Sequence, residues 1–528
     1  MKNKVTFFPI IGICAALFFH FLEIARAAEP VSQNEQTVTN TPADPTTARF
    51  LKEREINRKF GHNQHPDAQW FPDAGLGLFL HWDQSSVRAI GISNIIHGGV
   101  LRRQKTKLSP EECARIVREK DYNLTGKPVI TPNEYWGLAK EFNPTNYHPE
   151  VWLKKAKDAG FNYAVMTVKH HGGFCMWPSA FGEFNTKNSG MKGRDLVKEY
   201  VEACRSAGLK VGIYFSGPDY YLDRDYHAFV ANLFTGLDKD YPGQFPDLDL
   251  DLNPRPRVIH TPEQLAAHKE YLIKMIRGQL EELLTHYGKI DVLWLDGTPQ
   301  SGGDTSDKVM PFGRIRELQP GIIVTDRFHH YGDFTSVEIG MPQPENTRLE
   351  ASEWGEFCDV WAAHWSYTGH SYRPLGLLLS RMARTHAMGF NYLVDVGPMA
   401  SGDLDDGAHE NIAKLGDWMK VNGEAIHGTR ALQGTEKANV PAVSKGDVRY
   451  LYLVPAIRGE NDYRMPVKGD SNNSPSSASI TGLIGDYKAQ LLGGETLPVT
   501  RDGNTLIVEI PSGVPGETVR VVKLSPKF

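Results

Sequence analysis

Short apolar runs alternate along most of the chain with longer segments whose apolar residues recur at helical spacing. The apolar runs have the length and glycine boundaries of buried strands, and they lie at 75–82, 162–168, 210–216, 290–297, 321–327 and 391–398. Helical periodicity fills the stretches at 131–142, 149–159, 194–207, 261–287, 309–318, 377–388 and 407–421. With two short strands expected within 328–372, this alternation predicts an α/β fold, a (β/α)8-like TIM barrel over residues 48–428.

The pattern changes to period two from about residue 429. Residues 448–453, 505–510 and 518–524 alternate or run apolar, with turn residues between them. This spacing is typical of strands in an all-β domain, so residues 429–528 are predicted to form a small C-terminal β-sandwich.

The N-terminus has the pattern of a secretory signal. Lys2 and Lys4 precede an apolar run, and Ala25-Arg26-Ala27 supplies a small-x-small cleavage site. We therefore expect a signal peptide at 1–27, a flexible polar tether at 28–47, and a secreted or periplasmic protein with no membrane segment after cleavage.

Composition narrows the functional classes. The 528 residues carry a formal net charge of −5, which gives no reason to expect binding to nucleic acid or to an anionic membrane. Four cysteines of the mature chain match no zinc spacing and are expected to be buried thiols: Cys113, Cys175, Cys204 and Cys358. The sequence is compatible with an oligomer.

Polar side chains gather at the ends of the predicted strands. They are His81, Lys169, His170, His171, Tyr214, Trp294, Asp296, Arg327 and the glutamates between 338 and 356. Because the carboxyl ends of barrel strands face one pocket, these groups are expected to converge. Taken alone, Asp296 could equally be a helix cap or an ion-pair partner.

Two chemistries fit such a set. A metal-dependent hydrolase would use a His-x-His pair, which puts both rings on one face of a strand, whereas His170 and His171 are adjacent. Glycoside hydrolysis instead needs two carboxylates and neutral hydrogen-bonding groups for the sugar. Asp296 can be the nucleophile, ionised beside Arg327 or Lys169. The acid, with a raised pKa, would come from Glu338, Glu345, Glu350, Glu353 or Glu356, and Glu356 has the most aromatic surroundings.

Several motifs resemble those of the retaining α-L-fucosidases, glycoside hydrolase family 29. Phe79-Leu80-His81-Trp82 is similar to the family's first strand end, and Lys169-His170-His171-Gly172-Gly173-Phe174 to its Lys-His-His-Asp-Gly-Phe signature. Residues 212–216, 293–297 and 391–398 resemble the family's Gly-x-Tyr-x-Ser, nucleophile strand and closing Asn-x-Leu-Leu-Asn-x-Gly-Pro. The chain departs from the pattern at Asp83, where the family has glycine, at Gly172, where it has aspartate, and at Asp395, where it has asparagine.

The resemblance implies an exo-acting enzyme that releases terminal α-L-fucose from oligosaccharides or polysaccharides, without a cofactor or a metal. Asp296 would be the nucleophile and Glu356 the acid/base, with Glu353 and Glu338 in reserve. The sugar subsite would be lined by His81, His170, His171, Tyr214, Trp294 and Arg327. The alternatives are an enzyme for a related L-sugar such as an α-L-galactoside, a catalytically silent carbohydrate-binding relative, and the metal-dependent hydrolase.

Overall fold

The computed structural model describes residues 45–93, 96, 115, 130–226, 247–256, 258–299, 306–338, 348–362, 364–369, 372–455 and 476–527. The predicted signal peptide and most of the predicted tether lie outside these residues, as do Cys113, Glu345 and parts of the segments 83–127 and 217–260. In the part of the chain that is described, none of the helices is both long enough and apolar enough to cross a lipid bilayer.

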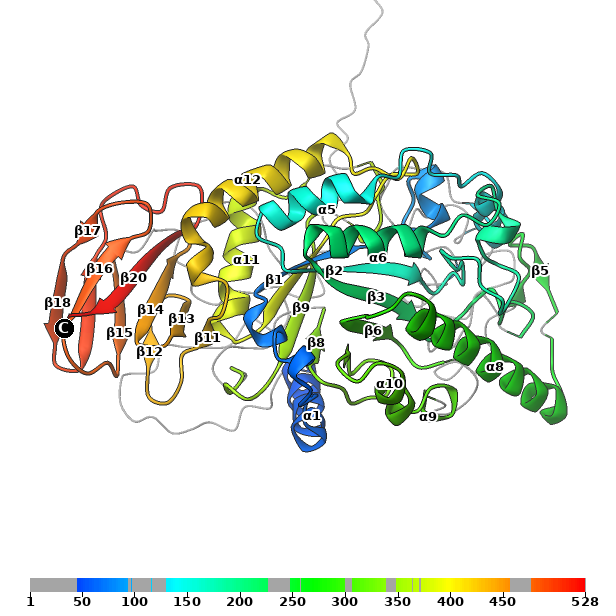
Figure 1. Ribbon diagram of the computed structural model, residues 1–528, viewed down its shortest axis with the longest axis horizontal. Coiled ribbons are helices and arrows are strands. Elements are labelled where there is room, and N and C mark those ends of the chain that lie inside the picture. The colour runs from blue at the N-terminus through cyan, green and yellow to red at the C-terminus, as the bar shows by residue number, and fades with distance from the viewer. Residues whose placement is uncertain are drawn as a thin grey trace, which may run out of the picture. The chain divides into compact units, whose positions relative to one another are not determined.

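Eight parallel strands form one curled sheet in the order β7-β6-β3-β2-β1-β10-β9-β8 (Figure 1). An isolated parallel bridge between Thr325 and Phe334 links the two ends of this order. The sheet is therefore TIM-barrel-like, as predicted, and β8 and β9 are the two strands expected within 328–372. Its strands are β1 (Leu76–Leu80), β2 (Tyr163–Lys169), β3 (Lys210–Ser216), β6 (Val292–Asp296), β7 (Ile323–Val324), β8 (Thr335–Val337), β9 (Gly355–Val360) and β10 (Asn391–Asp395).

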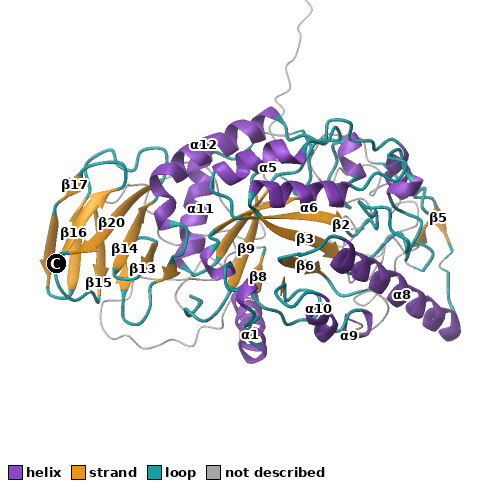
Figure 2. Ribbon diagram, viewed as in Figure 1, coloured by secondary structure: helices purple, strands orange, loops and turns teal. Residues whose placement is uncertain are grey.

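Helices connect most of these strands (Figure 2). They are α4 (Pro132–Gly137), α5 (Pro149–Asp158), α6 (Leu196–Ala207), α8 (Pro262–His286), α9 (Ser306–Val309), α10 (Phe312–Leu318), α11 (Leu375–Ala387) and α12 (Asp406–Asn422). The predicted capping box of α8 is present: Thr261 accepts a hydrogen bond from the backbone of Gln264, whose side chain bonds back. A short antiparallel pair, β4 (Asp247–Leu248) and β5 (Pro254–Arg255), lies within the 217–260 segment.

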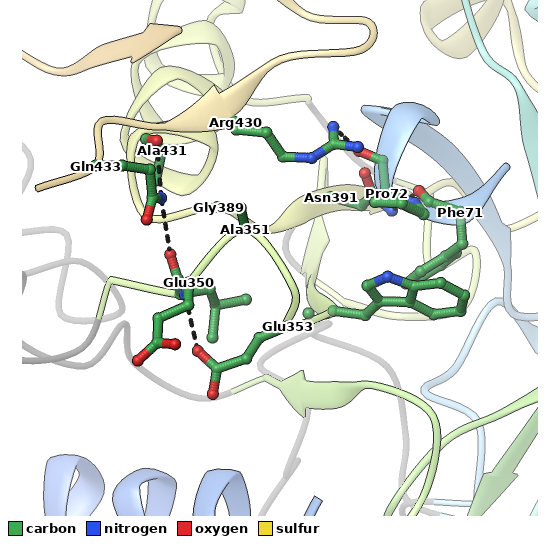
Figure 3. Close-up of a pocket in the computed structure, with 13 residues that line it drawn as sticks. Phe71, Pro72, Glu350, Ala351, Glu353, Gly389, Asn391, Arg430, Ala431 and Gln433 are labelled. Carbon is green, nitrogen blue, oxygen red and sulfur yellow. Dashed lines mark hydrogen bonds between the residues drawn. The ribbon is translucent and has the colours of Figure 1, made fainter. Parts of the chain in front are cut away.

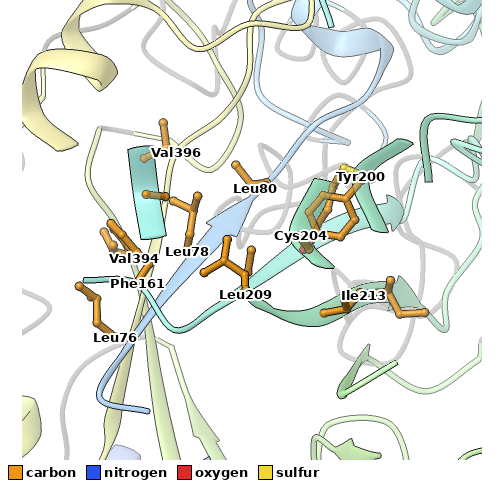
Figure 4. Close-up of a cluster of buried hydrophobic side chains, with 14 of the residues drawn as sticks. Leu76, Leu78, Leu80, Phe161, Tyr200, Cys204, Leu209, Ile213, Val394 and Val396 are labelled. Atoms are coloured by element: carbon orange, nitrogen blue, oxygen red, sulfur yellow. The ribbon is translucent and has the colours of Figure 1, made fainter. Parts of the chain in front are cut away.

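Strand side chains alternate between two hydrophobic layers. Leu76, Leu78 and Leu80 of β1 belong to the cluster that the surrounding helices cover (Figure 4). Phe79 and Tyr163 belong to a second cluster, which contains large aromatic side chains from several strands. This alternation follows from the two-residue period of a strand, and it leaves one row of side chains on each strand for the inside of the barrel.

A helix that the sequence did not predict, α1 (Pro45–Phe60), packs against β8. No helix lies in the connection between β7 and β8, residues 325–334, all of which are described. Asn57 of α1 donates hydrogen bonds to Asp326 Oδ2 (2.8 Å) and Thr335 Oγ1 (2.9 Å). The N-terminal helix thus takes the covering position that a β/α repeat would give to the missing helix.

Two antiparallel sheets follow the barrel. The six-stranded sheet has the order β11-β13-β14-β20-β16-β17, and the four-stranded sheet the order β12-β15-β19-β18. Their strands are β11 (Arg430–Ala431), β12 (Lys437–Ala438), β13 (Ala442–Lys445), β14 (Val448–Leu453), β15 (Ser477–Thr481), β16 (Tyr487–Leu491), β17 (Thr496–Leu497), β18 (Val499–Asp502), β19 (Thr505–Glu509) and β20 (Arg520–Pro526). The sheets share one hydrophobic cluster, and α11 packs against β11 and β13. The predicted all-β C-terminal region is confirmed.

Candidate active site

Asp296 is the last residue of β6, and it lies in register with Ser216, the last residue of β3. Gly297 follows in the left-handed region (φ +67°), which turns the chain away from the strand end without steric penalty. Position 217 also requires glycine, because a Cβ there would lie 2.1 Å from the Gly297 carbonyl oxygen. Two glycines therefore shape the backbone beside the Asp296 carboxylate.

Three side chains hold the Asp296 carboxylate. The Tyr214 hydroxyl donates a hydrogen bond to Oδ2 (2.7 Å), Arg327 Nε lies 3.3 Å from Oδ1, and His171 Nε2 lies 3.5 Å from Oδ2. Burial alone would raise the pKa of Asp296, but Arg327, His171 and Tyr214 outweigh it and bring the pKa below its ordinary value. Asp296 is therefore an anion in a largely desolvated position, which is the state a carboxylate nucleophile requires.

Arg327 joins this carboxylate to a second one. Its Nη2 forms an ion pair with Glu338 Oε2, so one guanidinium contacts both Asp296 and Glu338. Glu338 directly follows β8, at the same carboxyl end of the sheet as Asp296. The three side chains are 18% (Asp296), 21% (Arg327) and 23% (Glu338) exposed, so solvent or a substrate can reach them.

The two adjacent histidines both reach the site because the strand is irregular before them. The pairing of β2 with β3 shifts register between Thr167 and Lys169, and the rings of His170 and His171 then lie with centroids 4.3 Å apart. His170 stacks on Tyr214 (5.4 Å, 13°), while His171 faces Asp296. A backbone irregularity thus overcomes the divergence expected of neighbouring side chains on a strand.

His81 and Trp294 complete the cluster. Nδ1 of His81 lies 2.7 Å from Asp395 Oδ1, and burial lowers the pKa of His81 to about 3, so its ring is neutral. The Trp294 ring stacks on Tyr214 (5.3 Å, 20°) and lies beneath the Arg327 guanidinium (4.9 Å). Seven of the eight predicted site residues are therefore brought together, and Glu356 is the exception. The contact network consists of His81, His170, His171, Tyr214, Trp294, Asp296 and Arg327.

This arrangement of two carboxylates, a shared guanidinium and a neutral His81 at the strand ends agrees with a sequence comparison. The sequence model of the family described as alpha-L-fucosidase matches residues 51–424. The chain belongs to the alpha-L-fucosidase family.

Individual relatives are similar to this chain over most of its length. The tissue alpha-L-fucosidase of Macaca fascicularis is 25% identical over 495 residues, covering 88% of this chain and 90% of the relative. The corresponding enzyme of Homo sapiens is 24% identical over 494 residues, with the same coverage. As a member of the alpha-L-fucosidase family the protein is a glycosidase, which confirms the predicted family and enzyme class.

Solved alpha-L-fucosidase structures share the fold. Isoenzyme 1 from Paenibacillus thiaminolyticus is 26% identical, with a TM-score of 0.63 and coverage of 88% of this chain and 99% of that one. A trapped covalent intermediate of an alpha-L-fucosidase from Bacteroides thetaiotaomicron, 22% identical, has a TM-score of 0.64 and covers 88% and 97% of the two chains.

Glu356 does not lie at a strand end with the other predicted site residues. It is the second residue of β9, near the start of the strand rather than its carboxyl end, and is fully buried. Its two oxygens accept hydrogen bonds from the Tyr163 hydroxyl (2.6 Å) and from Trp294 Nε1 (2.7 Å). Burial raises the pKa of Glu356 to about 7, as an acid would need, but Trp294 lies between Glu356 and the Arg327 guanidinium. Its position argues against the acid/base role.

Two further side chains, Lys169 and Glu353, lie away from Asp296. Lys169 does not pair with Asp296, because its Nζ lies 2.9 Å from both Asp219 Oδ2 and Gln279 Oε1 in a fully buried position. Glu353, a reserve acid, forms an ion pair with Arg54 of α1. It lines a cavity beside the starts of β9 and β10 (Figure 3). Asp296, the last residue of β6, lies at the opposite end of the barrel. Glu353 is therefore a structural residue of the end that holds the cavity.

Several residues that support the histidines were not predicted. They are Asp395, which contacts His81, Ser216, which contacts His171, and Ser93, which contacts His170. Asp395 was noted only as a departure from the family pattern, and Ser216 ends the motif that carries Tyr214. Ser93 gave no sequence signal, because a serine in an irregular segment has no periodicity to mark it.

Three cysteines and the metal-ligating residue types bear on two further predictions. Cys175, Cys204 and Cys358 are buried free thiols, as expected. Among the residues that the structure describes, no three His, Cys, Asp or Glu side chains are grouped so that they could hold a metal ion. That the reaction needs no metal stays a prediction.

Proposed function

We propose that this member of the alpha-L-fucosidase family is an exported exo-enzyme that hydrolyses terminal α-L-fucosides with retention of configuration. Asp296 is the nucleophile and Glu338, in place of Glu356, is the acid/base. The observation that carries this assignment is the Arg327 guanidinium, which contacts both carboxylates at the carboxyl end of the barrel.

In the first step an oxygen of Asp296 attacks the anomeric carbon. The bond from that carbon to the leaving oxygen breaks, its electron pair stays on the oxygen, and Glu338 supplies the proton that the oxygen needs. The ionised state of Asp296, which Arg327, His171 and Tyr214 stabilise, makes the carboxylate available for attack.

In the second step Glu338 removes a proton from water, the water oxygen attacks the anomeric carbon, and the Asp296 carboxylate leaves. Once Asp296 is an ester its negative charge is gone, and Arg327 then pairs with Glu338 alone.

Buried, uncharged His81 and the rings around it suit the recognition of a neutral sugar. His81 lies between His170 (ring centroids 5.6 Å) and Trp365 (4.9 Å), and it contacts Tyr214 as well. Such rings supply hydrogen-bonding nitrogens and apolar faces together, and a pyranose ring presents hydroxyl groups and an apolar face in the same way.

The test is hydrolysis of 4-nitrophenyl α-L-fucoside by the wild type, Asp296→Asn and the exposed-site control Asp417→Asn. Asp417 lies on the surface of α12, with its side chain 75% exposed. We expect wild-type activity in the control and a loss of about a thousandfold or more in Asp296→Asn. The first sugar product of the wild type, followed by NMR, is expected to be the α anomer.

A wild type that leaves the α-L-fucoside intact but cleaves an α-L-galactoside would replace the proposed substrate by the related sugar. A wild type that cleaves neither while binding fucose would favour the silent relative. If the β anomer forms first, the double displacement is wrong.

Export is proposed from the sequence at 1–27 alone. N-terminal sequencing of the protein from the medium or the periplasm is expected to begin at Ala28. Recovery of the full-length chain from the cytoplasm alone would contradict export.

A further inference from the structure

Ser93 is a buried residue with a strained backbone beside the candidate active site. Its φ of +56° lies in the left-handed region, which a serine rarely adopts, and its side chain is 0% exposed. Strain of this kind persists where surrounding contacts determine the conformation, and it is concentrated at functional sites.

A chain of hydrogen bonds fixes this residue. The Ser93 backbone N–H donates to the Tyr135 hydroxyl (3.0 Å), and that hydroxyl donates to Asp83 Oδ2 (2.8 Å). Asp83 Oδ1 in turn accepts from the Ser85 backbone N–H (2.7 Å). Tyr135 and Asp83 are buried, so the network has a single arrangement in which each of these groups is paired.

The Ser93 hydroxyl then determines the proton position on His170. The Gly172 backbone N–H donates to Ser93 Oγ (2.8 Å), and His170 Nδ1 lies 2.8 Å from the same oxygen. Within the described chain Nδ1 is the acceptor placed to receive the hydroxyl proton, so Ser93 donates to Nδ1. In a neutral imidazole one nitrogen carries the proton, and in His170 this is Nε2.

His81 is held in the opposite tautomer, and His171 also donates from Nδ1. His81 Nδ1 faces Asp395 Oδ1 (2.7 Å), which also accepts the His81 backbone N–H (3.1 Å), so Nδ1 is the donor. Ser216 donates its hydroxyl proton to the Pro218 carbonyl oxygen (2.6 Å) and therefore accepts from His171 Nδ1 (2.5 Å). Neutral His81 therefore has a lone pair on Nε2, whereas neutral His170 has a proton there. The Nε2 of His171 faces the Asp296 carboxylate (3.5 Å).

We propose that Ser93 is a positioning residue that fixes His170 as an Nε2–H donor beside His81, whose Nε2 is an acceptor. This inference rests on the proposed function, in which these rings face the sugar. Sugar hydroxyls both donate and accept, so a donor beside an acceptor selects the orientation of each hydroxyl, which two identical tautomers would not do. Asp83 and Tyr135 support the serine from outside the site.

The two departures at Asp83 and Gly172 meet in this network. A Cβ on residue 172 would lie 3.2 Å from the Tyr135 hydroxyl oxygen and 3.3 Å from Ser93 Oγ. Glycine at 172 therefore lets the serine and the tyrosine approach the backbone after His171, and Asp83 supplies the carboxylate that orients the tyrosine.

The first test compares Ser93→Ala with Ser93→Gly. Both remove the hydroxyl, so both are expected to lower kcat/KM about tenfold through loss of the hydrogen bond to His170. Glycine also relieves the left-handed strain, so Ser93→Gly is expected to melt roughly 2–4 °C above Ser93→Ala. Lys192→Gly, at an exposed left-handed position (φ +51°), and Ser206→Ala, on the exposed face of α6, are the matched controls with wild-type kinetics.

The second test reads the tautomer directly and needs no turnover. In ¹⁵N-histidine-labelled protein the His170 signals are assigned by their absence in His170→Gln. We expect an unprotonated Nδ1 and a protonated Nε2 in the wild type at neutral pH, and a mixture of tautomers in Ser93→Ala. A wild-type proton on Nδ1, or wild-type kcat/KM in Ser93→Gly, would overturn the proposal. Failure of the wild type to cleave α-L-fucosides would instead refute the proposed function.

Discussion

The assignment of the acid/base to Glu338 rather than Glu356 is tested by two matched amide substitutions, Glu338→Gln and Glu356→Gln. Each replaces a carboxyl group by a group of the same shape that neither donates an acidic proton nor accepts one. Glu338 is 23% exposed and contacts Arg327, whereas Glu356 is buried and bonded to Tyr163 and Trp294. The two changes should therefore have different effects.

General acid catalysis contributes about 10²–10⁴-fold to a rate, which is about 3–5 kcal/mol of activation free energy. For a fucoside with an alkyl leaving group, which needs protonation, we expect Glu338→Gln to lose that factor. For 4-nitrophenyl α-L-fucoside the first step needs little acid, so hydrolysis of the glycosyl-enzyme becomes rate-limiting and KM falls. Azide, an anion that needs no base, should then restore turnover and give α-L-fucosyl azide.

For Glu356→Gln the structure predicts a change in stability instead. The amide oxygen can still accept from Trp294 Nε1, and the Tyr163 hydroxyl must rearrange to meet an NH₂ group. Disturbing one of these two buried hydrogen bonds costs about 1–3 kcal/mol of unfolding free energy, while kcat/KM should stay within about threefold of wild type. The assignment is wrong if Glu356→Gln, and not Glu338→Gln, shows the dependence on leaving group and the azide rescue.

Three further predictions follow from the same contacts. Burial raises the pKa of Glu356 from 4.5 to about 7. Protonated Glu356 therefore stabilises the fold fully below pH 4.5, and this stabilisation is lost as pH rises through 7. In denaturation measured against pH, the unfolding free energy of the wild type should fall by about 3 kcal/mol relative to that of Glu356→Gln. Parallel pH dependences of the two proteins would contradict this prediction. Asn57→Ala removes three hydrogen bonds to the β7–β8 region and should lower the unfolding free energy, measured in urea, by about 2–3 kcal/mol. The control Arg49→Ala, at an exposed position of the same helix, should lower it by less than about 0.5 kcal/mol. Equal effects of the two substitutions would refute the covering role of α1. Burial raises the pKa of Asp296, and Arg327 is the foremost group that lowers it. Arg327→Met should therefore raise this pKa and move the acid limb of the pH profile of kcat/KM to higher pH. An acid limb at the wild-type pH would show that Arg327 does not set the ionisation of Asp296.

The barrel could be predicted because its strands are buried on both sides and therefore appear as continuous apolar runs. The strand from 290 to 297 and the helix after Thr261 both have clear boundaries, a glycine and a capping box. Strands β7 and β8 have only two and three residues, too few to show any period. Helix α1 was missed because it is strongly charged and contributes a single buried large side chain, Phe50, to the core.

The site was predictable where a side chain follows a clear strand, and not elsewhere. The sequence places Asp296, Tyr214 and Arg327 at strand ends in this way, and in the structure the three side chains are in contact. Glu356 was chosen for its aromatic neighbours, but those neighbours cannot distinguish the start of a strand from its end, and Glu356 lies near the start of β9. Glu338 follows a strand too short to recognise. The supporting contacts of Ser93 and Asp395 join segments far apart in the sequence, and only the folded chain brings them together.

The central claim is that Asp296 forms a covalent bond to the sugar, and trapping that bond tests it most directly. The protein would be incubated with 2-deoxy-2-fluoro-α-L-fucosyl fluoride, digested, and analysed by mass spectrometry. We predict one added fluorofucosyl group, located on Asp296 in the peptide that contains Trp294. An adduct on another carboxylate, or no adduct on an enzyme that turns over α-L-fucosides, would contradict the account.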